Sequence, residues 1–365
     1  MAGSTLGTIF RISTWGESHG KALGVVIDGC PAGLALEEAH IQAFLDRRKP
    51  GSSLITTTRR EEDQVEILSG IFEGYTTGTP LSLMIRNTSQ RSGDYGNIAE
   101  CYRPGHADLT YDQKYGFRDY RGGGRSSGRE TAGRVAAGAV ASRILKQLGV
   151  DVYAYTRSIG PVEIDDSRFD RSAILSTPTA MPDREASLTA LEYLETVKKE
   201  SDSSGGSMEC VIEGLPSGIG DPVFEKLDAN LAKAVMSIGA VKAVEIGDGC
   251  QVSSRRGSEN NDALRMCDGN IVKQTNHAGG ILGGISDGSR ILLRAHVKPT
   301  PSIYRTQQTV TRSGENTDLC IQGRHDPIIV PRAVVVMECM VTLTILDAMM
   351  INMSARLDRM EKFYK

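Results

Sequence analysis

The most informative stretch of the sequence spans residues 121–134 and reads Arg-Gly-Gly-Gly-Arg-Ser-Ser-Gly-Arg-Glu-Thr-Ala-Gly-Arg. Its arginines carry forked donors that match phosphate and carboxylate groups, and its glycines let a ligand approach the backbone closely. Ser127 and Glu130 fit the S-x-x-E capping box, which predicts that a helix begins at the serine. Since the N-terminus of a helix attracts anions, the stretch predicts a site for a strongly anionic ligand.

The alternative is an arginine- and glycine-rich surface segment that is merely solvated or that contacts RNA. The residues after Arg134 argue against it, because the next turns consist mainly of alanine, glycine and valine. A helix with such small side chains lets neighbours pack closely on nearly every side and belongs in a protein core. The predicted anion site is therefore attached to a rigid element.

Three histidines lie in loops marked by glycine or proline, namely His19 in 16–20, His106 in 103–108 and His325 in 323–327. A loop histidine on a rigid scaffold can transfer protons near neutral pH. Any one of them alone is more often a structural hydrogen-bonding residue. Three of them beside arginines or serines, in a chain with six histidines, favour a chemical role.

Several common sites have no counterpart in the sequence. Ser18 precedes His19, but no G-x-S-x-G elbow is present, and no histidine spacing indicates a metal, so we expect none. There is also no Walker loop and no dinucleotide fingerprint. A second glycine-rich segment, 276–286, and the following 298–302 fit a flat ring and a phosphate, and equally an ordinary glycine-rich hairpin.

The elements that position these residues form two similar blocks. Residues 23–28 read as a strand, and the next helix carries Ile41, Phe44, Leu45 and Arg48 at positions i, i+3, i+4 and i+7. Arg48 thus extends a buried stripe, or alternatively snorkels at the helix end.

The second block repeats this pattern. A strand at 208–213 precedes a helix with Phe224, Leu227, Leu231, Ala234, Val235 and Ile238. Each block then leads through a charged loop to a buried helix. We infer an internal duplication within one domain, 1–365, with repeats at roughly 1–150 and 205–352.

The composition limits the classes of protein. With 365 residues and a net charge of −3, the chain can bury a large core and has no overall basic field that would attract nucleic acid or membrane. Seven cysteines without a C-x-x-C pair suit a reducing cytoplasm, and we expect no secretory signal. The apolar run 333–351 contains two acids and predicts a buried core helix rather than a membrane span.

These segments together resemble the chorismate synthase family. Residues 16–31 are similar to its first signature, 125–134 with the alanine-rich helix to its second, and 324–338 to its third. The resemblance extends in order over essentially the whole chain, including 103–108 and 276–286.

The resemblance implies an anti-1,4-elimination that converts 5-enolpyruvylshikimate 3-phosphate to chorismate and phosphate, with reduced FMN but no net redox change. It implies an α+β fold, a β-α-β sandwich in which antiparallel sheets flank a helical core, and a homotetramer. A separate flavin reductase would supply the reduced FMN, and neither nucleic acid nor membrane would be a partner.

Site residues follow from the matched motifs. The resemblance implies catalytic roles for Ser18, His19, His106, Ser127 and Asp326. It implies substrate binding by Ser18, His19, Arg48, Arg103, Arg129 and Arg134. It implies FMN contacts from Arg125, Ser126, Ser127, Gly239, Ala240, Gly283, Lys298, Pro299, Thr300, Pro301, Ser302 and Arg324.

Two positions depart from the family pattern. Leu54 stands where an arginine is common near the substrate or a pyridine nucleotide, which argues against direct use of NADPH unless Arg47, Arg59 or Arg60 substitutes. Gly239 stands where an asparagine is frequent and leaves a backbone contact only. The competing interpretations are an RNA-binding protein and a flavin-dependent oxidoreductase on the same scaffold.

Overall fold

The computed structural model describes residues 3–49, 62–88, 98–321 and 326–365 and combines helices with two antiparallel sheets, an α+β fold. The first sheet has the order β1-β2-β3-β7-β4, and every neighbouring pair in it is antiparallel. Its strands are β1 (Thr5–Leu6), β2 (Arg11–Gly16), β3 (Ala22–Asp28), β4 (Val65–Ser69) and β7 (Leu81–Arg86). The strand predicted at 23–28 is confirmed as β3.

The second sheet has the order β11-β16-β10-β8-β9 and is also antiparallel throughout. Its strands are β8 (Asp151–Ile159), β9 (Val162–Glu163), β10 (Gly206–Glu213), β11 (Val241–Ile246) and β16 (Ile291–Val297). Alternate residues of β16 are buried, as expected for a strand with one face on a core. The strand predicted at 208–213 is confirmed as β10.

Within the described residues, four two-stranded hairpins accompany these sheets. They are β5 (Ile71–Phe72) with β6 (Tyr75–Thr76), β12 (Leu264–Cys267) with β13 (Asn270–Lys273), β14 (Ile281–Leu282) with β15 (Ile285–Ser286), and β17 (Gln307–Val310) with β18 (Asn316–Leu319). The glycine-rich segment 276–286 thus contains a short hairpin. The β5–β6 hairpin directly precedes β7 of the first sheet, and the β14–β15 hairpin directly precedes β16 of the second. Each sheet thus has a short hairpin before one of its central strands.

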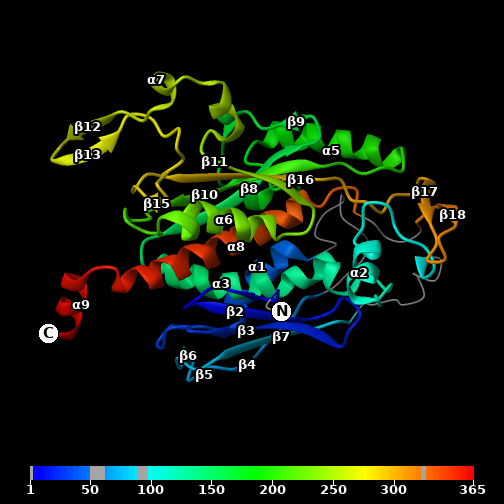
Figure 1. The fold of residues 1–365 in the computed structure, drawn as a ribbon, viewed down its shortest axis with the longest axis horizontal. Helices are drawn as coiled ribbons and strands as arrows, with labels where there is room; N and C mark the ends of the chain where they lie inside the picture. The colour runs from blue at the N-terminus through cyan, green and yellow to red at the C-terminus, as the bar shows by residue number, and fades with distance from the viewer. Residues whose placement is uncertain (1–2, 50–61, 89–97, 322–325) are drawn as a thin grey trace.

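The helices α1 (Glu38–Arg48), α3 (Thr131–Gln147), α6 (Leu227–Met236) and α8 (Val330–Ile351) lie between the two sheets (Figure 1). The small residues of α3 permit very close packing against α8. A Cβ atom added to Gly138 would lie 2.2 Å from Cys339 Cβ. The predicted core helix after Arg134 is confirmed.

The remaining helices lie at the periphery. These are α2 (Asp108–Tyr115), α4 (Ala173–Ser176), α5 (Arg184–Lys199), α7 (Gly257–Asn260) and α9 (Leu357–Tyr364). In Figure 1, α5 lies on the outer side of the second sheet and α9 projects from one end of the molecule.

Helix α8 is long and apolar enough to cross a membrane, but 72% of its most apolar window is buried within the protein. It is therefore the predicted core helix.

The two acidic residues of α8 both form hydrogen bonds with other parts of the protein. Glu338 forms a bidentate ion pair with Arg47 of α1, at 2.7 Å for each oxygen, and accepts a hydrogen bond from the Ala154 amide of β8. Burial of this pair away from water requires such full satisfaction of the carboxylate.

Asp347, near the other end of α8, holds the beginning of the chain. Its carboxylate accepts hydrogen bonds at 2.8–2.9 Å from the backbone amides of Thr8, Ile9 and Phe10. The first strands are thereby attached directly to the last core helix.

Two details of the predicted helices are wrong. Phe224 is 89% exposed and lies before α6, because the chain there forms a separate turn at Val223–Glu225. The capping box at Ser127 does not form. Ser127 caps a short 3₁₀ turn by accepting from the Arg129 amide, Glu130 pairs with Arg134 instead, and α3 begins at Thr131.

Candidate functional site

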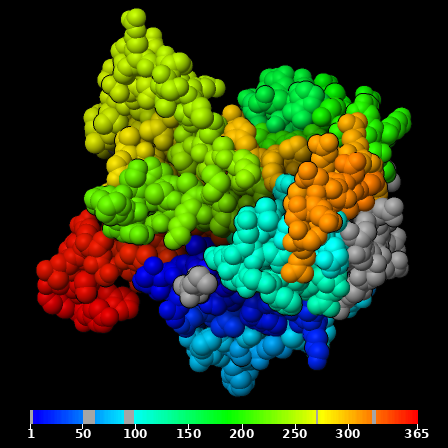
Figure 2. All heavy atoms as spheres, turned by 45° about the vertical axis from the view of Figure 1, so that its right-hand side comes forward, coloured from blue at the N-terminus to red at the C-terminus, as the bar shows by residue number. Residues whose placement is uncertain are grey.

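Loops from both sheets meet at the end of the molecule where α2 lies (Figure 1). Figure 2 turns this end forward and shows residues around 100–120 packed beside the β17–β18 hairpin. Backbone hydrogen bonds join the two segments, from the Tyr102 amide to the Val310 carbonyl and from the Arg312 amide to the Glu100 carbonyl. The start of the loop that carries Arg103 and His106 is therefore fixed to this hairpin.

The glycine loop of residues 122–124 brings two predicted histidines together. Gly122 and Gly123 have φ angles of 67° and 86°, which favour glycine. A Cβ atom on Gly122 would lie 2.5 Å from His19 Cε1, and one on Gly123 would lie 2.7 Å from His106 Cε1. Only glycine at both positions lets the loop lie directly against both imidazoles.

His106 rests on a charged pair. Its Nδ1 lies 3.0 Å from Asp108 Oδ1 and 3.0 Å from Arg103 Nη2. Arg103 itself donates to both oxygens of Asp108, from Nε at 2.7 Å and from Nη2 at 2.8 Å. Arg118 reaches the same carboxylate at 3.3 Å. Asp108 is thus the centre of a buried cluster at the start of α2.

The charges of this cluster shift two pKa values. Burial lowers the pKa of His106 below its usual 6.5, and Arg103 and Lys298 add to this, whereas Asp108 opposes it. Burial alone would raise the pKa of Asp108, but hydrogen bonds from Arg103 and His106 hold it far below its ordinary value. At neutral pH the carboxylate is ionised and the imidazole of the ligand-free protein is mostly neutral.

His19 has a neutral partner. Its Nδ1 lies 3.1 Å from the Ser18 hydroxyl, and both side chains are buried. The turn that carries them is fixed by Asn87, whose amide donates to the carbonyls of Glu17 and Gly20 at 3.0 and 2.8 Å.

Arg48 and Arg129 share one buried carboxylate. Asp63 accepts from Arg48 Nη2 at 2.6 Å and from Arg129 Nη1, and the two guanidinium groups hold the pKa of Asp63 below its usual value against the effect of burial. Arg48 is 2% exposed, which decides against the snorkelling alternative. Its Nε is buried and, among the described residues, has no hydrogen-bond partner. A buried donor of this kind is available to a ligand or a water molecule.

The other three arginines of the predicted anion site turn to different partners, and Arg121 pairs with Asp119. Arg125 donates to the Gly16 carbonyl and to Thr14 Oγ1 at 3.2 and 2.8 Å, so it lies along β2. Arg134 donates from Nη1 to Ser237 Oγ at 2.6 Å and so joins α3 to the end of α6. Each has part of its fork tied to the protein.

Lys298 connects the segment 298–302 to the His106 loop, because its Nζ donates to the Gly105 carbonyl at 2.6 Å. A hollow of about 280 Å³ opens between them. Its lining includes Pro104, Gly105, Ser203 and 298–301. The Thr300 hydroxyl is buried and has no hydrogen-bond partner among the described residues.

Four of the predicted FMN contacts lie on neighbouring elements. Ala240 accepts from the Lys298 amide at 2.9 Å, and Gly239 precedes it. Ser126 and Ser127 flank the glycine loop; the Ser126 hydroxyl donates to the Gly123 carbonyl at 2.7 Å.

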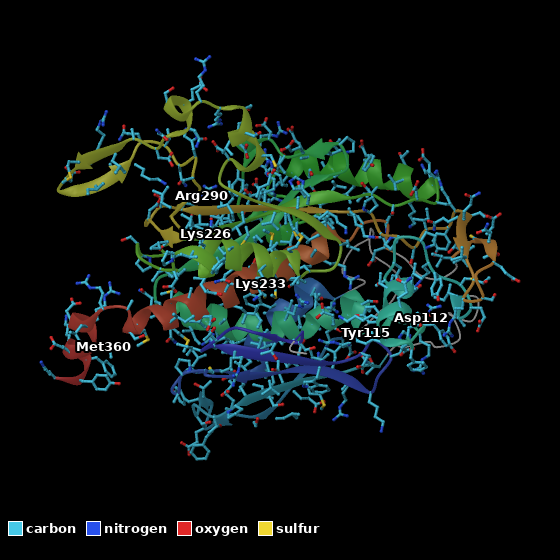
Figure 3. The ribbon with its side chains drawn as sticks, viewed as in Figure 1. Asp112, Tyr115, Lys226, Lys233, Arg290 and Met360 are labelled. Carbon is cyan, nitrogen blue, oxygen red and sulfur yellow. The ribbon has the colours of Figure 1, made fainter. Side chains whose placement is uncertain are left out.

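The structure does not bring Gly283 to this group. It lies in the β14–β15 turn, where the next residue accepts from the Leu227 amide at the start of α6. Ala240 follows the other end of that ten-residue helix, roughly 15 Å away by helix rise. Figure 3 shows Lys226, which contacts this turn, well apart from Asp112 of α2.

Asp326 is linked to Arg48 by Arg332, which donates hydrogen bonds to both residues. Arg332 Nη1 donates to Asp326 Oδ2 at 2.5 Å, and its Nε donates to the Arg48 carbonyl at 3.0 Å. Arg324 and His325, as well as Leu54, Arg59 and Arg60, lie outside the described residues.

Sequence reasoning missed the acids and amides that hold the site. Asp63 and Asn87 had no recognisable spacing to the arginine that joins them, Arg129, whose Nε donates to Asn87 Oδ1 at 3.0 Å. Asp108 stood within the quoted 103–108 segment, two residues after a candidate histidine, and this spacing was the available signal.

Comparisons with known proteins agree on one family. The family model described as chorismate synthase matches residues 10–350. Chorismate synthase of Agathobacter rectalis is 62% identical over 365 residues, and that of Lachnoclostridium phytofermentans is 60% identical over 366 residues, each with 100% of both chains covered. A crystal structure of a chorismate synthase is similar with a TM-score of 0.75 and 31% identity, covering 98% of this chain and 97% of that one.

Proposed function

Because the chain belongs to the chorismate synthase family and is a lyase of the shikimate pathway, we propose how its residues carry out the family reaction. This reaction eliminates phosphate from 5-enolpyruvylshikimate 3-phosphate and gives chorismate. The observation that carries the proposed mechanism is the glycine loop that lies against both His19 and His106, beside buried arginines.

The arginines bind the substrate. It carries a phosphate and two carboxylates, and guanidinium groups match such anions through charge-assisted hydrogen bonds. The buried Nε of Arg48, which has no partner among the residues described, is a donor available to the substrate. Arg103, Arg129 and Arg134 add positive charge, and the carboxylates of Asp108, Asp63 and Glu130 respectively hold these side chains before the substrate arrives.

Reduced FMN fits the hollow beside Lys298. The fit rests on Lys298, whose charge suits a phosphate, on Gly105 in the lining, and on the Thr300 hydroxyl, which has no hydrogen-bond partner in the described part of the chain. The residues that would hold it are Ser126, Ser127, Ala240 and 298–302, with Arg125 nearby. When bound, it supplies electron density for cleavage of the carbon–oxygen bond. The protein supplies orientation, charge and proton transfer.

The two histidines move protons. His19 donates to the departing phosphate, and His106 donates a proton from Nε2, the nitrogen on the side of the glycine loop. Since burial lowers the pKa of His106, the bound anions must favour its protonated form before it can donate. Asp326 accepts the proton that leaves the substrate, and Arg332 holds its carboxylate in place.

We further propose that the protein is a homotetramer of the cytoplasm that receives reduced FMN from a separate reductase. The expectation for NADPH rests on Leu54 alone. With NADPH in place of a chemical reductant, we expect no product until a flavin reductase is added. Product at a comparable rate without the reductase would contradict this.

We propose that the β-α-β sandwich arose by duplication. The support is the shared order of four strands: β8-β10-β16-β11 corresponds to β2-β3-β7-β4, and α6 and α8 correspond to α1 and α3. The edge strands β1 and β9 are not equivalent, since β1 precedes β2 and β9 follows β8. In this alignment β8 is equivalent to β2, so the second repeat starts near residue 151 rather than 205.

An anaerobic assay tests the function. The purified chain, substrate and chemically reduced FMN should give equal amounts of phosphate and chorismate, and the flavin should remain reduced at the end. Oxidised FMN should give no product. Net oxidation of the flavin in step with product would instead indicate an oxidoreductase, and the absence of phosphate release would exclude the proposed reaction.

A further inference from the structure

Asp108 is the most completely engaged acid near the glycine loop, and the family resemblance gave it no role. It is 3% exposed, and its two oxygens receive hydrogen bonds from the side chains of Arg103 and His106 and from the Arg103 amide. It lies in the first turn of α2, whose other end is marked by Asp112 and Tyr115 in Figure 3. The position of this carboxylate is therefore fixed by a helix rather than by the loop.

The geometry at His106 Nδ1 decides which proton the imidazole can exchange. Asp108 Oδ1 lies 3.0 Å from His106 Nδ1, and Arg103 Nη2 lies 3.0 Å from the same nitrogen. Because Nη2 already donates to Asp108 Oδ1 at 2.8 Å, we assign the Nδ1 hydrogen bond to the carboxylate. A carboxylate in this position accepts the Nδ1 proton, so the proton on Nδ1 stays in place when the imidazole loses its other one. The mobile proton is then the one on Nε2.

Nε2 lies on the opposite side of the ring, where the glycine loop passes. The Cβ position of Gly123 is 3.3 Å from Nε2 and 2.7 Å from Cε1. The Lys298 side chain crosses to the Gly105 carbonyl on the same loop as His106. Among the described residues, the charged groups that act most strongly on the imidazole are Asp108, Arg103 and Lys298.

We propose that Asp108 is a positioning residue, which fixes His106 with Nδ1 protonated and Nε2 toward the ligands and at the same time aligns Arg103. In the transfer step, the bond between Nε2 and its proton breaks, and the proton goes to the ligand. His106 is then neutral, and its remaining proton stays on Nδ1, hydrogen-bonded to the Asp108 carboxylate. The inference rests on the proposed role of His106, because Asp108 acts through that residue.

The test compares Asp108→Asn with Asp112→Asn in the full chain. Asp112 is a matched control: it lies on the same helix, is partly buried and also binds Arg118, which donates from Nε at 3.2 Å, whereas the hydrogen bond to His106 Nδ1 comes from Asp108. We expect Asp108→Asn to lower kcat about 10- to 100-fold, the range for a residue that orients a reacting group. Asp112→Asn should retain kcat within about threefold.

A double-mutant cycle separates positioning from general damage. In the His106→Ala background, Asp108→Asn should lower kcat no further than about threefold, because the residue it orients is gone. Additive losses, or equal losses in Asp108→Asn and Asp112→Asn, would overturn the inference. If the single variant His106→Ala retained full activity, both the proposed role of His106 and the inference about Asp108 would fail. If Asp108→Asn retained full activity while His106→Ala did not, the inference would fail and the role of His106 would stand.

A titration without cofactor gives a second readout. The imidazole signals of His106, followed by NMR in the chain alone, should report a lower pKa in Asp108→Asn than in the wild type, because the carboxylate favours the protonated form. They should also report loss of the Nδ1-protonated tautomer. An unchanged pKa and tautomer would overturn the inference even if activity fell.

Discussion

His19 and His106 lie against neighbouring glycines of one loop, yet they rest on different partners. The Nδ1 of His106 faces an ionised carboxylate and an arginine, whereas the Nδ1 of His19 faces the Ser18 hydroxyl. A hydroxyl can donate or accept and so adapts to either tautomer of the ring. A carboxylate accepts only. For the proposed proton-transfer roles, the difference means that one loop holds two imidazoles whose Nδ1 atoms have different hydrogen-bond partners, a carboxylate for His106 and an adaptable hydroxyl for His19.

The strongest test of this comparison removes each ring. His106→Ala and His19→Ala should each lower turnover by about 10²–10⁴, the usual scale for a positioned acid–base group. His296→Ala is a suitable control, since His296 lies on β16, half exposed and 3.6 Å from Glu245. Turnover is measured as phosphate release with reduced FMN. Full activity in either loop variant would remove that histidine from the mechanism.

The next largest effect concerns the loop itself. Gly122→Ala and Gly123→Ala should each lower turnover about 5- to 100-fold, because a positive φ and a Cβ collision together cost roughly 1–3 kcal/mol. Gly257→Ala, where a Cβ meets no atom within 4 Å, should leave turnover unchanged. If only one loop glycine proves sensitive, the two histidines do not depend on the loop in the same way.

The partner of His19 should matter less than its ring. Ser18→Ala removes one neutral hydrogen bond, worth about 0.5–1.5 kcal/mol, and should lower kcat about 2- to 10-fold. The kcat of this variant is compared with that of Asp108→Asn. A larger loss in Ser18→Ala would reverse the proposed contrast between an adaptable and a fixed partner.

The smallest expected effect is the number of protons taken up when the substrate binds. Because burial and nearby cations lower the pKa of His106, the ring is mostly neutral at pH 7, and a bound anion should raise its pKa. Substrate binding should therefore take up as much as about one proton per site near neutral pH. Calorimetry in buffers of different ionisation enthalpy measures this uptake. It should vanish in His106→Ala and persist in His296→Ala.

The sequence predicted the elements better than their connections. Periodicity located β3, β10, α1 and the two core helices, because apolar spacing is a local property. It also marked Arg48 as an extension of the buried face of α1. Periodicity could not predict the ion pairs that hold the site. Asp63 and Arg129 are 66 positions apart in the sequence and come into contact only in the folded chain.

The start of α3 shows a local limit as well. Ser127 and Glu130 satisfy the pattern of a capping box, but Glu130 pairs with Arg134, and the serine caps a 3₁₀ turn. An ion pair four residues apart on a helix competes for the same carboxylate that the box requires. A short motif therefore predicts that a turn forms here but does not decide which group the Glu130 side chain binds.

The attachment of the first residues to Asp347 also bears on how the chain matures during synthesis. The amides of Thr8, Ile9 and Phe10 find their acceptor on a helix that is translated more than 330 residues later. Until that helix leaves the ribosome, residues 8–10, between β1 and β2, lack their anchor, although α3, which packs on β2, β3 and β7, is synthesised much earlier. The core is therefore completed only when α8 emerges and packs on α3 and on β8 and β10 of the second sheet.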